Sequence, residues 1–264
     1  HYARLIFSNS QTTVYRTQKF VIEKPEGPAA KWRYSLLGSS KATPTLDNGI
    51  LYVGGTEGRL YAIDVSTGNA KWTFTTDGEI ITKPAAANGL VYFGSGDGNL
   101  YAVGLDGKLK WRFKADSPIY SSPCMDGDSI YFGSKNGTFY ALRSDNGVMR
   151  WKYNPGGSYC IEAAPSVRNG LVYYTAWDSY IYAIETKSGS MFWRERAEGC
   201  IIRPGAKKYF SAADSIPVLT KSPLNLFVAD RDFYLSAINL QTGSVSWYTT
   251  NCLAVSASEE ENSR

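Results

Sequence analysis

Short apolar runs alternate along this chain with turns rich in glycine, asparagine and aspartate. The segment 88–103 is representative: it has an Asn-Gly turn, the run 90–93, a glycine-rich turn at 94–98 and the run 100–103. Short β-rich runs that are separated by Asn-Gly or Asp-Gly turns are typical of β-hairpins. No stretch has the apolar spacing of an amphipathic helix. The pattern therefore predicts an all-β protein made of short antiparallel strands.

The pattern repeats about every 40 residues. Six of the seven tryptophans mark the period, at spacings of 40, 39, 40, 42 and 54 residues, and a proline series marks it in a second phase. The two series are Trp32, Trp72, Trp111, Trp151, Trp193 and Trp247, and Pro44, Pro84, Pro123, Pro165 and Pro217. A repeat of this length with four short strands predicts the blades of a β-propeller.

The segment that ends at each later tryptophan carries a recurring phrase, which reads YAIDVSTGNAKW at 61–72. It resembles the docking motif A-x-D-x-x-T-G-x-x-x-W of the PQQ-like, or quinoprotein-type, β-propeller repeats. The matching residues are Ala62, Asp64, Thr67, Gly68 and Trp72. The later copies match in part, with Gly104, Arg143, Glu185 and Asn239 at the aspartate position. The resemblance spans about residues 32–250, and it implies that each tryptophan packs between neighbouring blades and that each Thr-Gly turn ties one blade to the next.

We expect six four-stranded antiparallel blades that form one domain over residues 1–264. The runs 5–7 and 14–15 align with the second and third strands of a blade, whose first strand is missing at the N-terminus. The run 253–256 follows Trp247 at the right place to supply that strand. A blade stitched from both ends would hide the edge strands that an open propeller exposes. The alternative is a fragment of a seven- or eight-bladed protein.

The copies stop being alike in the second half of the chain. With blades numbered by their prolines and the stitched blade counted sixth, blades one to three have glycine-rich turns between their second and third strands. The corresponding turns 175–179, 229–233 and 8–12 lose these glycines. The Trp-to-Pro loops lengthen from 12 residues in the first three copies to 14 and then 24. In a propeller these turns and loops share one face, so we expect the altered copies to surround one mouth of the channel.

We therefore predict a ligand- or partner-binding face over blades four to six. Trp177 carries most weight, because it occupies the turn position of Gly96, and an exposed aromatic on a turn is suited to stacking. The predicted set is Tyr159, Glu162, Trp177, Asp178, Arg203, Tyr209, Arg231 and Asp232. The alternatives are that Trp177 merely buries the inserted loop and that Glu162 and Arg203 form a salt bridge or are solvated loop charges.

Three of the four cysteines, Cys160, Cys200 and Cys252, fall in these altered loops. Cys160 and Cys200 could form a disulfide that pins the inserted loop, which would suit an oxidising compartment. The alternative is buried thiols, which we favour for Cys124. A zinc site has less support, because no C-x-x-C spacing is present.

Several functional classes can be set aside. The only histidine is His1, which removes His-dependent nucleophilic catalysis and multi-histidine metal sites. The net charge is +4, and Lys and Arg are scattered along the sequence, so we expect no nucleic-acid partner. No apolar run is long enough for a membrane span. The sequence also lacks the adjacent cysteines that the quinone-dependent relatives carry over their cofactor.

The prediction is a non-catalytic binding or scaffold propeller without a cofactor. We expect a monomer that binds a protein or a glycan. We expect the protein to be periplasmic or secreted, and its full-length precursor could carry a lipid anchor. The alternative is a quinone- or sugar-acting propeller enzyme, either like the PQQ-dependent dehydrogenases or acting on a glycan. The candidate carboxylates for acid-base chemistry are Glu162, Asp178, Asp230 and Asp232, although no spacing pairs two of them.

Overall fold

The computed structural model describes residues 2–9, 12–19, 31–196, 216–220, 225–229 and 234–250. All regular structure in these segments is β-strand. Contacts divide the chain into two units, 1–34 and 35–264, each of which is described by itself. Among the described residues, no helix is long and apolar enough to cross a membrane.

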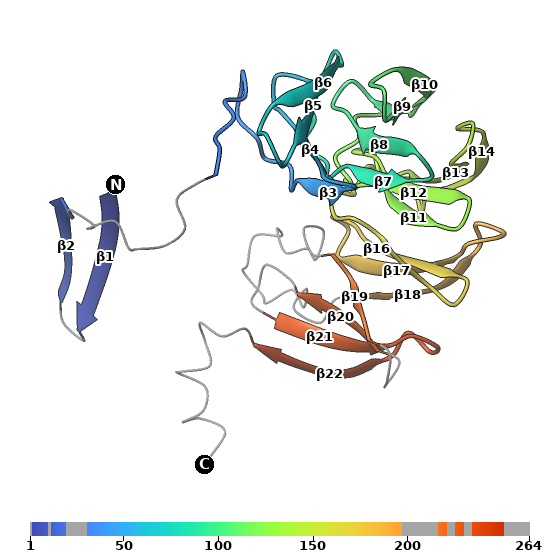
Figure 1. Ribbon diagram of the computed structural model, residues 1–264. Coiled ribbons are helices and arrows are strands. Elements are labelled where there is room, and N and C mark those ends of the chain that lie inside the picture. Colours follow the sequence, from blue (N-terminus) through green and yellow to red (C-terminus); the bar gives the residue numbers. More distant parts are fainter. Residues whose placement is uncertain are drawn as a thin grey trace. The chain divides into compact units, whose positions relative to one another are not determined.

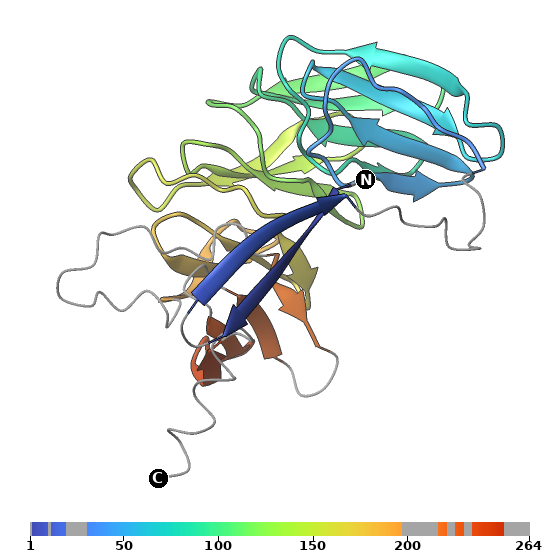
Figure 2. The ribbon, with the colours of Figure 1, turned by 90° about the vertical axis from the view of Figure 1, so that its left-hand side faces the viewer.

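The larger unit consists of five four-stranded antiparallel sheets that follow one another in chain order, and each sheet is one blade (Figures 1 and 2). Blade one has β3 (Thr45–Asp47), β4 (Ile50–Gly54), β5 (Arg59–Asp64) and β6 (Ala70–Thr75). Blade two has β7 (Ala85–Ala87), β8 (Leu90–Gly94), β9 (Asn99–Gly104) and β10 (Leu109–Lys114). Blade three has β11 (Cys124–Asp126), β12 (Ser129–Gly133), β13 (Phe139–Arg143) and β14 (Met149–Tyr153). Blade four has β15 (Ser166–Arg168), β16 (Leu171–Thr175), β17 (Tyr180–Glu185) and β18 (Met191–Arg196). Blade five has β19 (Val218–Leu219), β20 (Asn225–Ala229), β21 (Tyr234–Asn239) and β22 (Val245–Thr250).

Within each blade the strands pair in sequence order, so the first and fourth strands are the two edges. The first strands β3, β7, β11, β15 and β19 lie next to one another from blade to blade. The fourth strands therefore form the outer edges. This arrangement confirms the all-β propeller fold that the repeat predicts.

The smaller unit contains an antiparallel hairpin of β1 (Tyr2–Asn9) and β2 (Thr12–Lys19), paired from Asn9 with Thr12 to Tyr2 with Lys19. This pairing agrees with the expectation that the runs 5–7 and 14–15 are neighbouring strands. The proposed closing strand, 253–256, lies outside the described residues. The count of six blades, the ring closure and the single domain over 1–264 therefore stay predictions.

The turn between the first and second strands follows directly from its sequence. Asn48, Asn88 and Asn169 have positive φ angles of 45°, 54° and 52°, and the glycine after each also has a positive φ. Two successive left-handed residues make the tight turn whose twist matches an antiparallel hairpin, and Asn-Gly is the pair that adopts it most readily.

Blades are joined by the tryptophans of the repeat. The Nε1 atoms of Trp111 and Trp151 donate to the carbonyl oxygens of Ser144 and Thr186 in the following blades, at 3.0 and 2.8 Å. The rings also lie against the glycine of the next blade's turn, where a Cβ on Gly189 would come within 2.7 Å of Trp151. The structure thus confirms the inter-blade packing that the repeat family implies.

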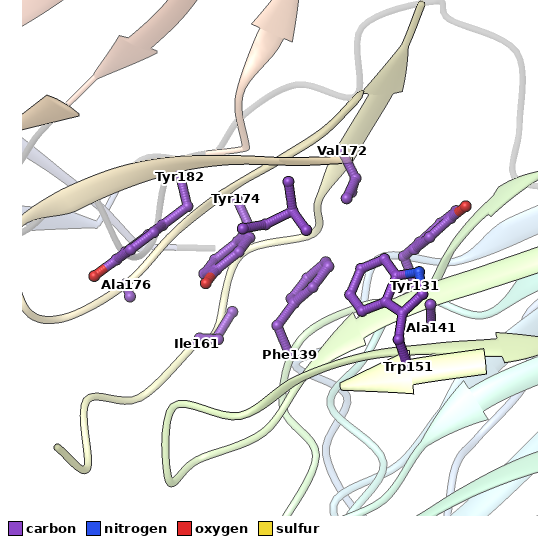
Figure 3. Close-up of a cluster of buried hydrophobic side chains, with 10 residues drawn as sticks. Tyr131, Phe139, Ala141, Trp151, Ile161, Val172, Tyr174, Ala176 and Tyr182 are labelled. Atoms are coloured by element: carbon purple, nitrogen blue, oxygen red, sulfur yellow. The ribbon is translucent and has the colours of Figure 1, made fainter. Parts of the chain in front are cut away.

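A second aromatic layer fills the space between blades three and four (Figure 3). Phe139 stacks on Tyr174 with ring centroids 4.2 Å apart, and Tyr174 stacks on Tyr182 at 4.9 Å. Each ring is fully or almost fully buried. Because these rings come from both blades, they fix the relative position of the loops that emerge above them.

Candidate functional site

The described loops between blades one to four are each clamped between two turns. The amide of Ile80 donates to the carbonyl of Gly55 in blade one, at 3.0 Å, and the amide of Gly96 in blade two donates to the carbonyl of Glu79, at 2.8 Å. The same pair of bonds recurs for the next loop, through Ile119 and Lys135. The structure therefore confirms that the inter-blade loops and the second-to-third-strand turns share one face, called here the loop face.

Glycines make this clamp tight. A Cβ on Gly54, Gly94 or Gly133 would overlap the side chain of Ile80, Ile119 or Ile161, respectively, in the following loop. Those three isoleucines are fully buried. Blade four has Thr175 at this position, which is one of the departures from the repeat that the sequence indicates.

The loop face of blades three and four gathers four residues, Tyr159, Cys160, Glu162 and Trp177, which we call the loop-face cluster. The amide of Trp177 donates to the carbonyl of Cys160 at 3.0 Å. The thiol of Cys160 lies 3.6 Å from Oε1 of Glu162. Three of the eight predicted site residues are thus brought together around one cysteine, although they come from an inter-blade loop and a separate turn.

Tyr159 is the exposed member of the cluster, with 46% of its surface accessible, whereas Glu162 and Trp177 are half-buried. Two glycines hold its backbone and its ring in place. A Cβ on Gly137 would lie 2.8 Å from the carbonyl oxygen of Tyr159, and one on Gly157 would lie 2.5 Å from its ring. The aromatic ring is therefore presented to solvent from a fixed backbone.

Polar groups that sequence reasoning missed flank the cluster. Tyr120 lies close to Glu79, and the Nζ of Lys135 lies 5.8 Å from the centroid of the Tyr120 ring. Burial raises the pKa of Tyr120, and the nearby Glu79, Cys160 and Glu162 raise it further. The sequence could have identified both residues, because Tyr120 and Lys135 occupy the repeat positions of the predicted site residues Glu162 and Trp177.

Asp178 has a defined role within its own turn. Its Oδ1 accepts from the amide of Tyr180 at 3.0 Å, and its Oδ2 accepts from the hydroxyl of Tyr182. Asp97 makes the equivalent contacts in blade two, with Asn99 at 2.8 Å and Tyr101 at 2.7 Å. The carboxylate of Asp178 therefore belongs to the repeat scaffold, and its participation in binding stays a prediction.

The remaining predicted site residues lie outside the described residues: Arg203, Tyr209, Arg231 and Asp232. The same holds for Asp230, Cys200 and Cys252, so both alternatives for the cysteines stay open. Cys124 is a half-buried thiol, and burial together with Asp126 raises its pKa to about 11. Cys124 is thus poorly suited to act as a nucleophile.

The described residues do not fit the quinone and calcium of the dehydrogenase relatives. No three His, Cys, Asp or Glu side chains of the described segments lie together as a metal site would require. The sequence contains no adjacent cysteines. The loop-face cluster combines aromatic and polar side chains, and it contains no group of three metal-ligand residues.

Solved structures with a similar fold include BamB and quinohemoprotein alcohol dehydrogenases. The crystal structure of BamB from Moraxella catarrhalis has a TM-score of 0.60 and 14% identity, and it covers 95% of this chain and 90% of that one. The quinohemoprotein alcohol dehydrogenase from Comamonas testosteroni has a TM-score of 0.67 and 16% identity. It covers 81% of this chain, which spans only 43% of the dehydrogenase. At these identities the likeness establishes the fold alone.

Sequence comparison assigns the family. No curated protein matches the chain significantly. The family model described as outer membrane protein assembly factor BamB matches residues 23–249, which include every blade of the larger unit. The chain therefore belongs to the PQQ-like propeller family of the outer membrane protein assembly factor BamB.

Proposed function

We propose that this chain is a non-catalytic binding propeller that holds a protein partner on its loop face, at the loop-face cluster. The observation that carries the proposal is the meeting of Tyr159, Glu162 and Trp177 around Cys160, with Tyr159 exposed. Gly96 of blade two occupies the turn position that Trp177 occupies in blade four. The turn between the second and third strands can therefore form without a large side chain at this position. The tryptophan is therefore not required to close the turn, and its partly exposed surface would contribute to the binding face.

The chemistry of the cluster favours a protein over a small substrate. A tyrosine and a tryptophan provide large rigid contact surfaces with polar tips, and such residues concentrate binding energy at protein interfaces. Glu162, Glu79 and Lys135 supply a polar rim around them. Membership of a family described as an assembly factor for outer membrane proteins supports a partner of this kind and a location outside the cytoplasm, in the periplasm or secreted.

A site-specific photocrosslinker tests the proposal in the cells that make the protein. The probe replaces Tyr159 in one variant and Leu46 in another. Leu46 is 63% exposed on β3, beside the Asp47–Ile50 turn that lies at the other end of β4 from the loop face. We expect discrete protein adducts from position 159 and none of the same mass from position 46. Identical adducts from both positions, or none from position 159, would contradict the proposal.

A further inference from the structure

The outer strand of blade four, β18, has an unusual exposed face. Phe192, Arg194 and Arg196 are exposed, whereas Trp193 and Glu195 between them are half-buried. Alternate residues of a strand point to the same side, so Arg194 and Arg196 form one row, and Phe192 lies beside them at a β-bulge. β18 is the last strand of its sheet, and among the described strands it pairs only with β17 (Figure 1).

Phe192 stands where blades one to three have a charged residue. The position before the docking tryptophan is a cation in blades one to three, and each cation contacts a carboxylate of its own blade. The pairs are Lys71 with Asp64 at 3.4 Å, Lys110 with Asp106 at 3.7 Å, and Arg150 with Asp128. Charges on an edge strand discourage pairing with other chains. In blade four Phe192 is 50% exposed and Met191 beside it is 43% exposed, so this protection is absent.

The two arginines of the row form no ion pair with the residues that the structure describes. Within the described residues, no carboxylate lies within 4.0 Å of Arg194 or Arg196. The Arg194 guanidinium instead lies 4.9 Å from the centroid of the Tyr180 ring. The corresponding exposed positions of the two preceding outer strands are also basic, with Lys110, Arg112, Lys114, Arg150 and Lys152. Lys110, Arg150 and Lys152 are paired with Asp106, Asp128 and Asp116, so Arg194 and Arg196 differ from them in having no such ion pair among the described residues.

We propose that β18 receives an extended acidic segment of a partner protein by strand addition. The partner's backbone would pair with the open edge of β18, with acidic side chains beside Arg194 and Arg196 and an apolar side chain beside Phe192. Charge complementarity selects the acidic partner. The open row of backbone N–H and C=O groups selects a polypeptide over a lipid surface or a nucleic acid, since only another extended backbone can satisfy it.

This surface uses other residues than the loop-face cluster. β18 is an outer strand, and its end at Arg196 pairs with Tyr180, which follows the turn of Trp177. The proposal is therefore independent of the proposed function: a chain with both arginines reversed in charge should still give the crosslink from position 159.

The test measures binding of the full chain to a synthetic peptide, Thr-Leu-Thr-Glu-Thr-Glu-Thr, by calorimetry at low and high salt. We expect the parent chain to bind and the variant Arg194→Glu/Arg196→Glu to bind at least about tenfold more weakly. The matched control, Thr73→Glu/Thr75→Glu, places the same charges at the same repeat positions of β6 and should bind as the parent does. A second peptide, N-methylated at alternate residues, cannot pair with a strand and should not bind.

Several results would overturn the proposal. These are no binding of the peptide by the parent chain, equal binding by the charge-reversed variant, or equal binding of the methylated peptide. Vesicles of phosphatidylglycerol and a single-stranded oligonucleotide form the remaining arms. Arginine-dependent binding to either of them that is tighter than binding to the peptide would assign the surface to a lipid or a nucleic acid and reject the acidic polypeptide.

Discussion

The Nε1 atom of Trp72 donates a hydrogen bond to the carbonyl oxygen of Leu105 in the next blade, at 2.8 Å. Two residues further along, Gly107 presents its α-carbon to the face of the same indole. The pair explains why the repeat keeps both a tryptophan and a turn glycine: the ring needs a backbone without a side chain to lie against.

Replacement of Gly107 by alanine tests this relationship. The residue has a φ of 78°, and a Cβ there would lie 2.8 Å from Cγ of Trp72. We expect a loss of about 2–3 kcal/mol in the free energy of unfolding, from backbone strain and displacement of the ring. Gly89→Ala is the matched control, because its φ is 75° and a Cβ there would have nothing within 4 Å. It should cost only about 1 kcal/mol. Equal losses in urea unfolding would refute the contact with Trp72.

Gly94 tests the clamp beneath the loop face. A Cβ on Gly94 would collide with the Cγ2 methyl of Ile119. We expect Gly94→Ala to lower the free energy of unfolding by about 1–3 kcal/mol, because the loop must shift to make room. The double variant Gly94→Ala/Ile119→Ala, which removes this methyl, should lose less than the sum of the two single variants. Strict additivity in thermal unfolding would show that the two residues do not compete for the same space.

Alkaline pH should weaken the turn of blade two. The hydroxyl of Tyr101 donates to Asp97 at 2.7 Å, and burial together with this bond raises the pKa of Tyr101 from 10.0 to about 12. Between these values the unfolded chain releases the proton while the folded chain retains it, so the stability from this group falls as pH rises. Tyr101→Phe should therefore lose stability less steeply than the parent over that range. Parallel slopes in a pH series of urea unfolding would contradict the raised pKa.

Cys124 should be slow to react. Its pKa of about 11, against an ordinary 9.0, lowers the thiolate fraction near pH 8 about 100-fold. We expect iodoacetamide to modify the peptide that contains Cys124 at least that much more slowly in the folded chain than in the denatured chain, as measured by mass spectrometry. Similar rates in both states would show that the thiol is not held in an apolar environment.

Much of the architecture could be predicted because the same sequence features recur at the same positions of each repeat. The tryptophans, the Asn-Gly turns and the alternating runs each reflect a local requirement, such as a positive φ or a buried ring, and each recurs in phase. The grouping of Tyr159, Glu162 and Trp177 could be predicted because the repeat gives the position of each turn and loop, and these residues lie in turns and loops that share one face. Ring closure was predicted from both ends of the chain, and its deciding segment, 253–256, lies outside the described residues.

The grouping of side chains from different repeats on one surface is not apparent in the linear sequence. Arg112, Lys152 and Arg194 look scattered because about 40 residues separate each from the next. In the fold they occupy the same exposed position of successive outer strands. Asp178 was chosen as a binding residue because it is charged and lies on an altered turn. Its bond to Tyr182 follows from a spacing that Asp97 and Tyr101 share, and that spacing was the overlooked signal.

The most direct test of the loop-face cluster is the yield of the crosslinked adduct from position 159 in a chain that also carries Trp177→Ala. Thr56→Ala is the matched control, because Thr56 occupies the same turn position in blade one. The account predicts that Trp177→Ala removes most of the adduct, at least about tenfold, as expected for a central aromatic contact, while thermal stability is retained and Thr56→Ala gives the parent yield. An undiminished adduct in the folded Trp177→Ala chain would contradict the assignment of this cluster as the binding surface.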